Sequence, residues 1–211
     1  MEIHGPHKPI LTVAEALVHL AIVTAGILIA LSFEGVRQWH EHRSLVSETR
    51  ENLTREIEAN RTELAGYDQS ASAMQSQLQH ARDVVQVMLS GKPLREASID
   101  LTYHAAELQA ASHATAELRG AFAFMDRDEV VKYARVYDRQ AAFQRRQDQV
   151  FADFAGALAG TRLLADGPGK ATTRELEDWK RALATAHASA EIAKQVAVAL
   201  NQEYQRALNG P

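Results

Sequence analysis

Two histidine–glutamate pairs come closest, in residue type and spacing, to metal-binding chemistry. His104 and Glu107 are three residues apart, and His113 and Glu117 are four apart, so each pair would share one face of a helix. Helical bundles can hold di-metal centres with such pairs. The two histidines are nine residues apart, however, which at about 100° per residue places them on opposite faces of a single helix. The pattern disfavours a shared metal site, and we expect no cofactor.

Other residue patterns give no indication of catalysis. Gly169-Lys170 lacks the upstream glycine spacing and the following Ser or Thr of a phosphate-binding loop. His40 and His42 are two residues apart and would point in different directions on a helix. The sequence has no cysteine, which removes disulfides, thiolate metal sites and cysteine nucleophiles together. The expectation is a protein that is not an enzyme.

The charge of the chain argues against nucleic acid as a partner. The formal net charge is −4, with 27 acidic and 23 basic side chains. A nucleic-acid-binding domain needs a basic face to neutralise phosphates. We therefore expect no nucleic-acid partner.

One apolar stretch dominates the first part of the sequence. Leu20 to Phe33 contains nothing more polar than Thr24 and Ser32, and counting from Ala16 the stretch has 18 residues. At ~1.5 Å per residue this is about the minimum that crosses a hydrocarbon core of ~30 Å. The stretch predicts a single transmembrane helix, with its interfaces, over residues 12–39.

Two other interpretations of this stretch remain open. A signal peptide would have a basic start and a small-x-small cleavage site, for which Ala30-Leu31-Ser32 could serve. The 19 residues before Leu20 hold one Lys, no Arg and two Glu, which is a poor basic region. A buried helix of a soluble protein normally shows a polar face, and Leu20–Phe33 has none. A membrane anchor fits best.

Small residues recur at four-residue spacing inside the predicted span. Ala21 and Ala25 form one such pair, and Gly26 and Ala30 form another. Small-xxx-small spacings let helix backbones approach closely in lipid. They predict self-association through the transmembrane helix, or packing on other membrane protein subunits; the alternative is that Ala and Gly are simply common in spanning helices.

Residues on both sides of the span are typical of a membrane interface. His19 lies one turn inside the first boundary, from where its side chain reaches the interface. Glu34, Arg37 and Trp39 follow the apolar stretch, and we expect Trp39 at the level of the lipid headgroups. Membrane lipid is thus the first expected partner.

The rest of the chain divides into a short arm and a large helical domain. Gly5, Pro6 and Pro9 predict an extended N-terminal arm over residues 1–11. Thr12 and Glu15 then form a plausible capping box. Residues 40–211 are expected to form a helical bundle domain.

A heptad pattern predicts that the first helix continues far beyond the membrane. Apolar residues alternate steps of three and four for 43 residues from Val46 to Met88, with Arg50 and Asn60 as polar members. Because both polar members lie in the membrane-proximal part of the pattern, we expect that part to be splayed or to face a partner. A hairpin turn near Gly66 is the alternative, but a turn gives no reason for the pattern to keep its phase. Ser90-Gly91-Lys92-Pro93 ends the helix.

Four further helices are expected, and no segment shows the period of a strand. The last one has an alanine-rich apolar face from Leu176 to Ala207, over which a neighbouring helix can pack closely. The fold class is therefore all-α: an N-terminal transmembrane helix that continues into a long helix, with an elongated antiparallel helical bundle. The expected helices are Ile99–Ala111, Ala114–Phe124, Glu129–Ala159 (capped by Asp126 and closed by Gly160) and Thr173–Leu208.

The membrane segment resembles a known group of proteins. Val18-His19-Leu20 followed by Thr24–Leu31, Glu34 and Trp39-His40 is similar to uncharacterised bacterial single-pass inner-membrane proteins with a GILIAL-type N-terminal membrane helix. In these an Arg/Glu/Asn-rich helix follows directly, here Thr49–Leu64. The resemblance covers about a third of the chain. It implies an inner-membrane protein with an all-helical domain and no catalytic residue.

The function expected from these features is that of a membrane-anchored scaffold or accessory subunit of a larger membrane complex. The alternative is a single-pass sensor whose helical domain binds a small ligand. Two observations disagree about which side of the membrane the helical domain occupies. Lys8 precedes the membrane helix, whereas Arg37, Arg43 and Arg50 follow it, and this excess of basic residues favours a cytoplasmic domain. The resembling group commonly has a basic N-terminal arm, which implies a periplasmic domain, and we favour the periplasm.

Overall fold

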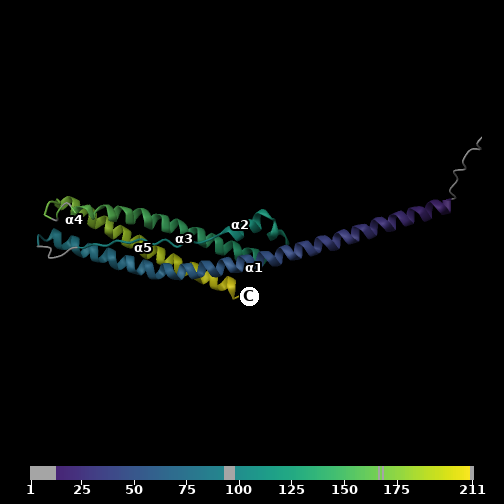
Figure 1. Ribbon diagram of the computed structural model, residues 1–211, viewed down its shortest axis with the longest axis horizontal. Helices are drawn as coiled ribbons and strands as arrows, with labels where there is room; N and C mark the ends of the chain where they lie inside the picture. Colours follow the sequence, from purple (N-terminus) through teal and green to yellow (C-terminus); the bar gives the residue numbers. More distant parts are fainter. Residues whose placement is uncertain (1–12, 93–97, 166, 168, 210–211) are drawn as a thin grey trace, which may run out of the picture. The chain divides into compact units, whose positions relative to one another are not determined.

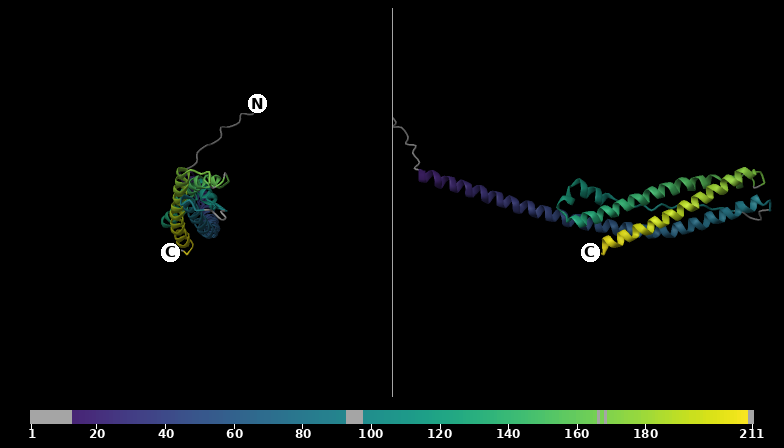
Figure 2. Two further views of the ribbon diagram at one scale, coloured as in Figure 1. Left: turned by 90° about the vertical axis from the view of Figure 1, so that its left-hand side faces the viewer. Right: turned by 180° about the vertical axis from the view of Figure 1, so that it is seen from behind.

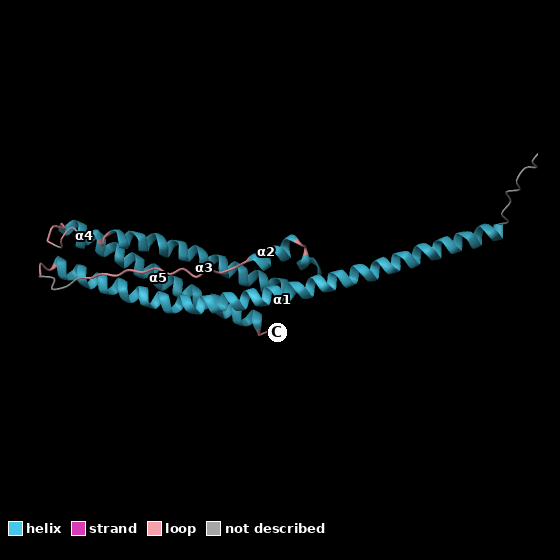
Figure 3. Cartoon of the chain, viewed as in Figure 1, coloured by secondary structure: helices cyan, strands magenta, loops and turns pink. Residues whose placement is uncertain are grey.

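The computed structural model describes residues 13–92, 98–165, 167 and 169–209. These residues form helices and loops and contain no β-strand, as Figure 3 shows. The predicted all-α fold is therefore confirmed. The predicted arm 1–11, Thr12 and Pro93 lie outside the described residues.

The first helix, α1, runs without interruption from Val13 to Leu89, over 77 residues. It passes through Gly66, so the prediction of one continuous helix is confirmed and the hairpin alternative is wrong. Gly91, at φ +68°, follows the last turn, a conformation that glycine adopts without steric cost. The chain separates after Glu48 into two compact units, so α1 contributes to both. We call the described residues up to Glu48 the anchor unit and those from Thr49 onward the helical unit.

Three long helical segments run alongside one another in the helical unit: the later part of α1, α3 (Arg127–Ala159) and α5 (Thr173–Leu208) (Figures 1 and 2). The bounds of α5 are those predicted. Its apolar face is buried as expected, and its alanines let α3 and α5 approach closely. The buried residues of α5 are Leu176, Trp179, Leu183, Ala186, Ala190, Ala193, Ala197, Leu200, Tyr204 and Ala207.

The helix ends are fixed by local side-chain hydrogen bonds. The Asp126 carboxylate accepts from the Asp128 backbone N–H and caps α3, as predicted. Gly160 ends α3, also as predicted. Thr172 and Glu175 form a capping box at the start of α5. A short helix that was not predicted, α4 (Arg162–Ala165), lies between α3 and α5.

The prediction of a helix from Ile99 to Ala111 is wrong. Residues 98–110 form no helix; they run as an extended segment beside α1 and α3, which we call the strap (Figure 3). The prediction of a helix from Ala114 to Phe124 is correct only in part. The structure has α2 (Ala111–Leu118) and a 3-10 turn, η1 (Ala121–Phe124), separated by Gly120 at φ +67°.

The expectation of a splayed segment at the two polar heptad positions is also wrong. Arg50 forms a two-point ion pair with Glu129 of α3, with nitrogen–oxygen distances of 2.7 Å. Asn60 is only 1% exposed. Leu53, Ile57 and Leu64 are buried as well, so this part of α1 belongs to the core of the helical unit.

Candidate functional site

The predicted membrane segment presents an apolar surface on all sides within the anchor unit. Its most apolar 18-residue window has none of its residues buried. Val23, Ile27 and Leu31 are each more than half exposed, as are their apolar neighbours around the helix. The Ser32 hydroxyl donates to the Leu28 carbonyl at 2.7 Å, so this polar group is satisfied within the helix. A helix of this length and composition can cross a membrane.

The four small residues singled out in this segment lie on the helix surface. Ala21, Ala25, Gly26 and Ala30 are all exposed. A methyl group added at Gly26 would meet no atom within 4 Å. The anchor unit therefore has room for another helix along this face.

The far boundary of the segment carries a compact group of polar and aromatic side chains. Arg37 forms ion pairs with Glu34, three residues before it, and Glu41, four residues after it, about one helical turn on either side. The Arg43 guanidinium lies over the Trp39 ring, 5.3 Å from its centre. A tryptophan whose ring contacts a cation is suited to the headgroup region of a bilayer. His19, at the other boundary, is exposed on α1.

A second candidate site, in the helical unit, consists of five amide side chains and one carboxylate that bind the strap. Gln147 of α3 accepts from the Ala106 backbone N–H at 2.7 Å and donates to the Ala106 carbonyl at 3.0 Å. Asn60 of α1 does the same for Gln109, with both distances 2.7 Å. Each side-chain amide thus pairs with both backbone groups of one residue.

Further side chains of α1 and α3 bind the strap between and around these two pairs. Gln140 donates to the Gln109 carbonyl at 2.8 Å, and Gln144 donates to the Leu108 carbonyl at 3.2 Å. On α1, Glu63 accepts from the Glu107 N–H at 3.2 Å and Gln77 accepts from the Thr102 N–H at 2.9 Å. We call this set the amide clasp: Asn60, Glu63, Gln77, Gln140, Gln144 and Gln147.

The centre of the amide clasp is a buried hydrogen-bond network. Gln140 accepts from Asn60 at 3.1 Å and from the Tyr204 hydroxyl at 2.7 Å, which connects α1, α3 and α5. Because these polar groups are buried and paired, removing one would leave others unsatisfied. The network therefore fixes the position of the strap relative to three helices.

A buried carboxylate lies immediately beyond the strap. Glu56 accepts from the Tyr137 hydroxyl at 2.6 Å and from the Ser112 backbone N–H at 2.7 Å. Burial, with the hydrogen bond to Glu56, raises the pKa of Tyr137 well above its usual range. The phenol therefore stays protonated and remains a donor to the carboxylate.

The two histidine–glutamate pairs lie in different elements, whereas the sequence predicted both on helices. His104 and Glu107 lie in the strap rather than on a helix, whereas His113 and Glu117 lie on α2. Among the described residues no group of three or more His, Cys, Asp and Glu side chains is placed to hold a metal ion. His113 instead packs against the rings of Tyr137 and Phe122, at 4.3 and 5.2 Å between ring centres.

We expect His113 to make the stability of the helical unit depend on pH. Burial lowers its pKa, and Glu117 and Glu56 only partly oppose this effect. The unfolded chain, with a histidine pKa near ~6.5, therefore takes up this proton at a higher pH than the folded chain does. Stability that is present above about pH 6.5 should be lost as the pH falls below it. Urea unfolding at pH 7.5 and 5.5 measures the loss, and His113→Gln should reduce it. An equal loss in the variant would exclude His113 as its source.

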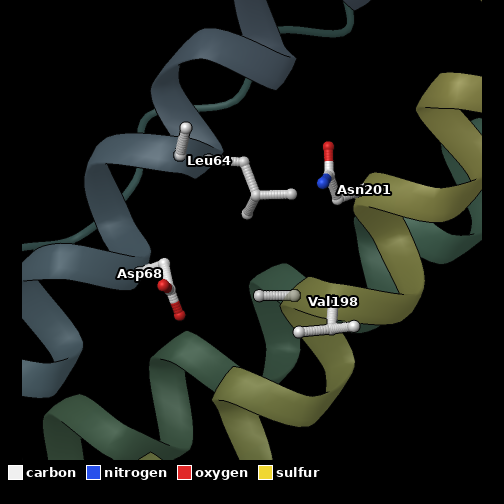
Figure 4. A pocket seen from close by; sticks show the side chains of 6 residues that line it. Leu64, Asp68, Val198 and Asn201 are labelled. Carbon is white, nitrogen blue, oxygen red and sulfur yellow. The ribbon is translucent and has the colours of Figure 1, made fainter.

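A shallow groove lies between α1 and α5 of the helical unit. Figure 4 shows Leu64 and Asp68 on α1 facing Val198 and Asn201 on α5. Lys194 of α5 approaches Asp68 to 3.9 Å and donates to Ser72 at 2.9 Å. The volume of the groove, about 270 Å³, lies below the ~300–1,000 Å³ typical of ligand sites. This groove is therefore small for the ligand site that the sensor alternative requires.

Comparison of the chain with protein-family models, curated proteins and solved structures finds no match. The class of protein that the fold defines is an all-α helical unit joined through one continuous helix to an apolar helical segment. The amide clasp was not predicted, although the sequence contains an indication of it. Gln140 and Gln147 are seven residues apart on the buried face of α3, and Asn60 lies on the buried face of α1.

Proposed function

We propose that the protein is a non-catalytic, membrane-anchored helical scaffold or accessory subunit of a larger membrane complex. The observation that carries this proposal is the contrast between the two parts of α1. Its first part exposes an all-round apolar surface, whereas from Leu53 onward the same helix buries one face in the helical unit. A surface that is apolar on every side matches lipid rather than water as its surroundings.

This contrast separates the proposal from one of its rivals. The apolar helix of a soluble core is mostly covered by its own chain, and this segment is not. The signal-peptide alternative predicts a mature chain that lacks the segment, so the mass of the mature protein decides it.

We propose the bacterial inner membrane as the location, with the helical unit in the periplasm. The resemblance of Val18–Leu31 to single-pass inner-membrane proteins supports the membrane and, through the usual orientation of that group, the periplasmic side. The chain departs from the group in its N-terminal arm, where Lys8 is the one Lys or Arg. The basic residues Arg37, Arg43 and Arg50 support the cytoplasmic alternative. Protease added to intact spheroplasts distinguishes the two, because complete protection of a C-terminal tag would place the helical unit in the cytoplasm.

The partner contact in the membrane is proposed to use Ala21, Ala25, Gly26 and Ala30. Replacing Gly26 and Ala30 together by leucine keeps the segment apolar, so insertion should be retained. The larger side chains should prevent close approach of a second helix and reduce cross-linked or co-purifying species several-fold. Chemical cross-linking in membranes, followed by detergent extraction, measures this.

A matched control uses residues of the same helix that are already large. Ile27→Leu and Leu31→Ile lie on the opposite side of the helix from the four small residues, so they change the shape of the segment without touching the small-residue face. These substitutions should leave cross-linking unchanged. Cross-linked species that persist in the Gly26→Leu, Ala30→Leu variant would show that the contact lies elsewhere.

A further inference from the structure

The buried polar side chains of the helical unit serve mainly one task. The described residues of this kind are Thr49, Glu56, Asn60, Gln140 and Gln147. Three of them bind the strap itself, and Glu56 binds the backbone of Ser112 just after it. Burying polar groups in a helical core is costly unless each is hydrogen-bonded. The helical unit therefore accommodates an extended chain at a position where a helical bundle would ordinarily place apolar side chains.

The amide clasp binds that chain mainly through its backbone, and Gln77 also donates to the Thr102 hydroxyl at 3.4 Å. Asn60 and Gln147 each pair with the N–H and the C=O of one strap residue. A neighbouring β-strand makes the same two-point pairing with an extended peptide. Because every residue except proline offers these two groups, such binding accepts many sequences.

The strap contributes little apolar burial of its own. Ala106 and Leu108 are its buried side chains, while Ile99, Leu101 and Tyr103 are half-buried and the side chains between them are exposed. Segments with few buried apolar contacts open at lower free energy than the core around them. Gly91 lies before the strap and Gly120 lies after it. Both have a positive φ and open space around them.

We propose that the groove between α1 and α3 is a binding site for an extended polypeptide segment of a partner protein, and that the strap occupies this site within the chain. The partner segment would displace the strap and form the same backbone hydrogen bonds with the amide clasp. This proposal deepens the scaffold function by naming what the helical unit holds. It does not depend on membrane insertion, so the two proposals can fail separately.

The test uses the full chain in mild detergent and a fluorescent synthetic peptide of residues 98–112. Ala106→Pro removes the N–H that Gln147 accepts from, and so weakens the strap in its own groove. The apparent affinity of the groove for an added peptide rises in proportion to the fraction of molecules in which the strap has left the groove. We expect the peptide to bind the Ala106→Pro chain at least about tenfold more tightly than the unsubstituted chain, measured by fluorescence anisotropy.

Two matched comparisons show whether the binding uses the amide clasp. In the Ala106→Pro chain, Gln144→Ala should weaken binding about fivefold, because it removes one hydrogen bond to the peptide backbone. Gln149→Ala, on the same helix but bonded to Asp153, should have no effect. A peptide N-methylated at the positions of Ala106 and Gln109 keeps every side chain and should lose at least tenfold in affinity.

Three results would overturn the proposal. One is the absence of peptide binding to an Ala106→Pro chain that keeps its helical circular dichroism. Another is equal affinity for the N-methylated and unmethylated peptides. If Ala106→Pro does not fold, a chain with residues 98–110 replaced by Gly and Ser of equal length takes its place, and failure of that chain to bind the peptide also overturns the proposal. None of these results bears on whether residues 16–33 span a membrane.

Discussion

Insertion of two alanines after Gly66 should abolish cooperative unfolding of the helical unit. Two residues rotate everything beyond them by about 200° around the axis of α1. The buried side chains beyond Gly66 would then point to solvent while those before it stayed in place. Four of these, Tyr67, Met74, Leu78 and Val85, are at most 3% exposed. At ~1.5–3 kcal/mol each, their exposure costs roughly 6–12 kcal/mol, comparable to the ~5–15 kcal/mol stability of a domain.

The same two alanines placed after Gly169 provide the control. That site lies in the connection between α4 and α5, where extra length is absorbed at little cost. Thermal unfolding followed by circular dichroism should show a cooperative transition for this control and not for the Gly66 insertion. If the Gly66 insertion and the Gly169 control unfolded with the same midpoint temperature, this would contradict the role of α1 as a single helix whose buried face is continuous across Gly66.

Gly160→Ala should destabilise the helical unit by about 2–4 kcal/mol. A β-carbon at this position would overlap the indole ring of Trp179, which is 3% exposed. The ring would have to move, and with it the 2.8 Å hydrogen bond from its Nε1 to the Ala157 carbonyl would be lost. Overpacking of a core costs ~1–3 kcal/mol, and a lost buried hydrogen bond adds ~1 kcal/mol. Urea unfolding measures the sum.

Gly156→Ala, one turn earlier on α3, is the matched control. Gly160 has φ −73° and ψ −17°, which alanine also adopts, so the expected loss is steric rather than conformational. A β-carbon at Gly156 meets nothing within 4 Å, and this residue lies inside the helix. Alanine there should stabilise by ~0.5–1 kcal/mol. If both variants shifted stability in the same direction, Trp179 would not be seated against residue 160.

The long helices could be predicted from the sequence because their buried faces repeat in phase. On α5, each residue of the expected apolar face is buried, and the bounds agree with the structure. On α1, the phase of the pattern across Gly66 correctly excluded a turn. Asp126 marked the start of α3 for the local reason that the structure shows, a side-chain cap. Gly160 ends α3 as predicted, although its backbone keeps a helical conformation and the Trp179 ring lies against it.

The strap could not be predicted in the same way, because its conformation is imposed by distant residues. The alternation of Ile99, Leu101 and Tyr103, typical of an extended chain, was missed from the sequence, where Leu101, Ala105 and Leu108 also have helical spacing. The amides of Asn60 and Gln147, 49 and 41 residues away from their partners, select the extended form. Local propensity was overridden by tertiary hydrogen bonds. Whether Ala21, Ala25, Gly26 and Ala30 contact a partner remains a prediction.

The most direct test of the membrane anchor is alkaline carbonate extraction of membranes from cells that produce the full chain, followed by intact mass measurement. Carbonate strips proteins held at the surface but not those with a spanning helix. We predict that the protein stays with the membrane pellet at its full mass of 23.3 kDa. Release into the supernatant, or a mature chain that lacks residues up to Ser32, would contradict the anchor and with it the proposed function.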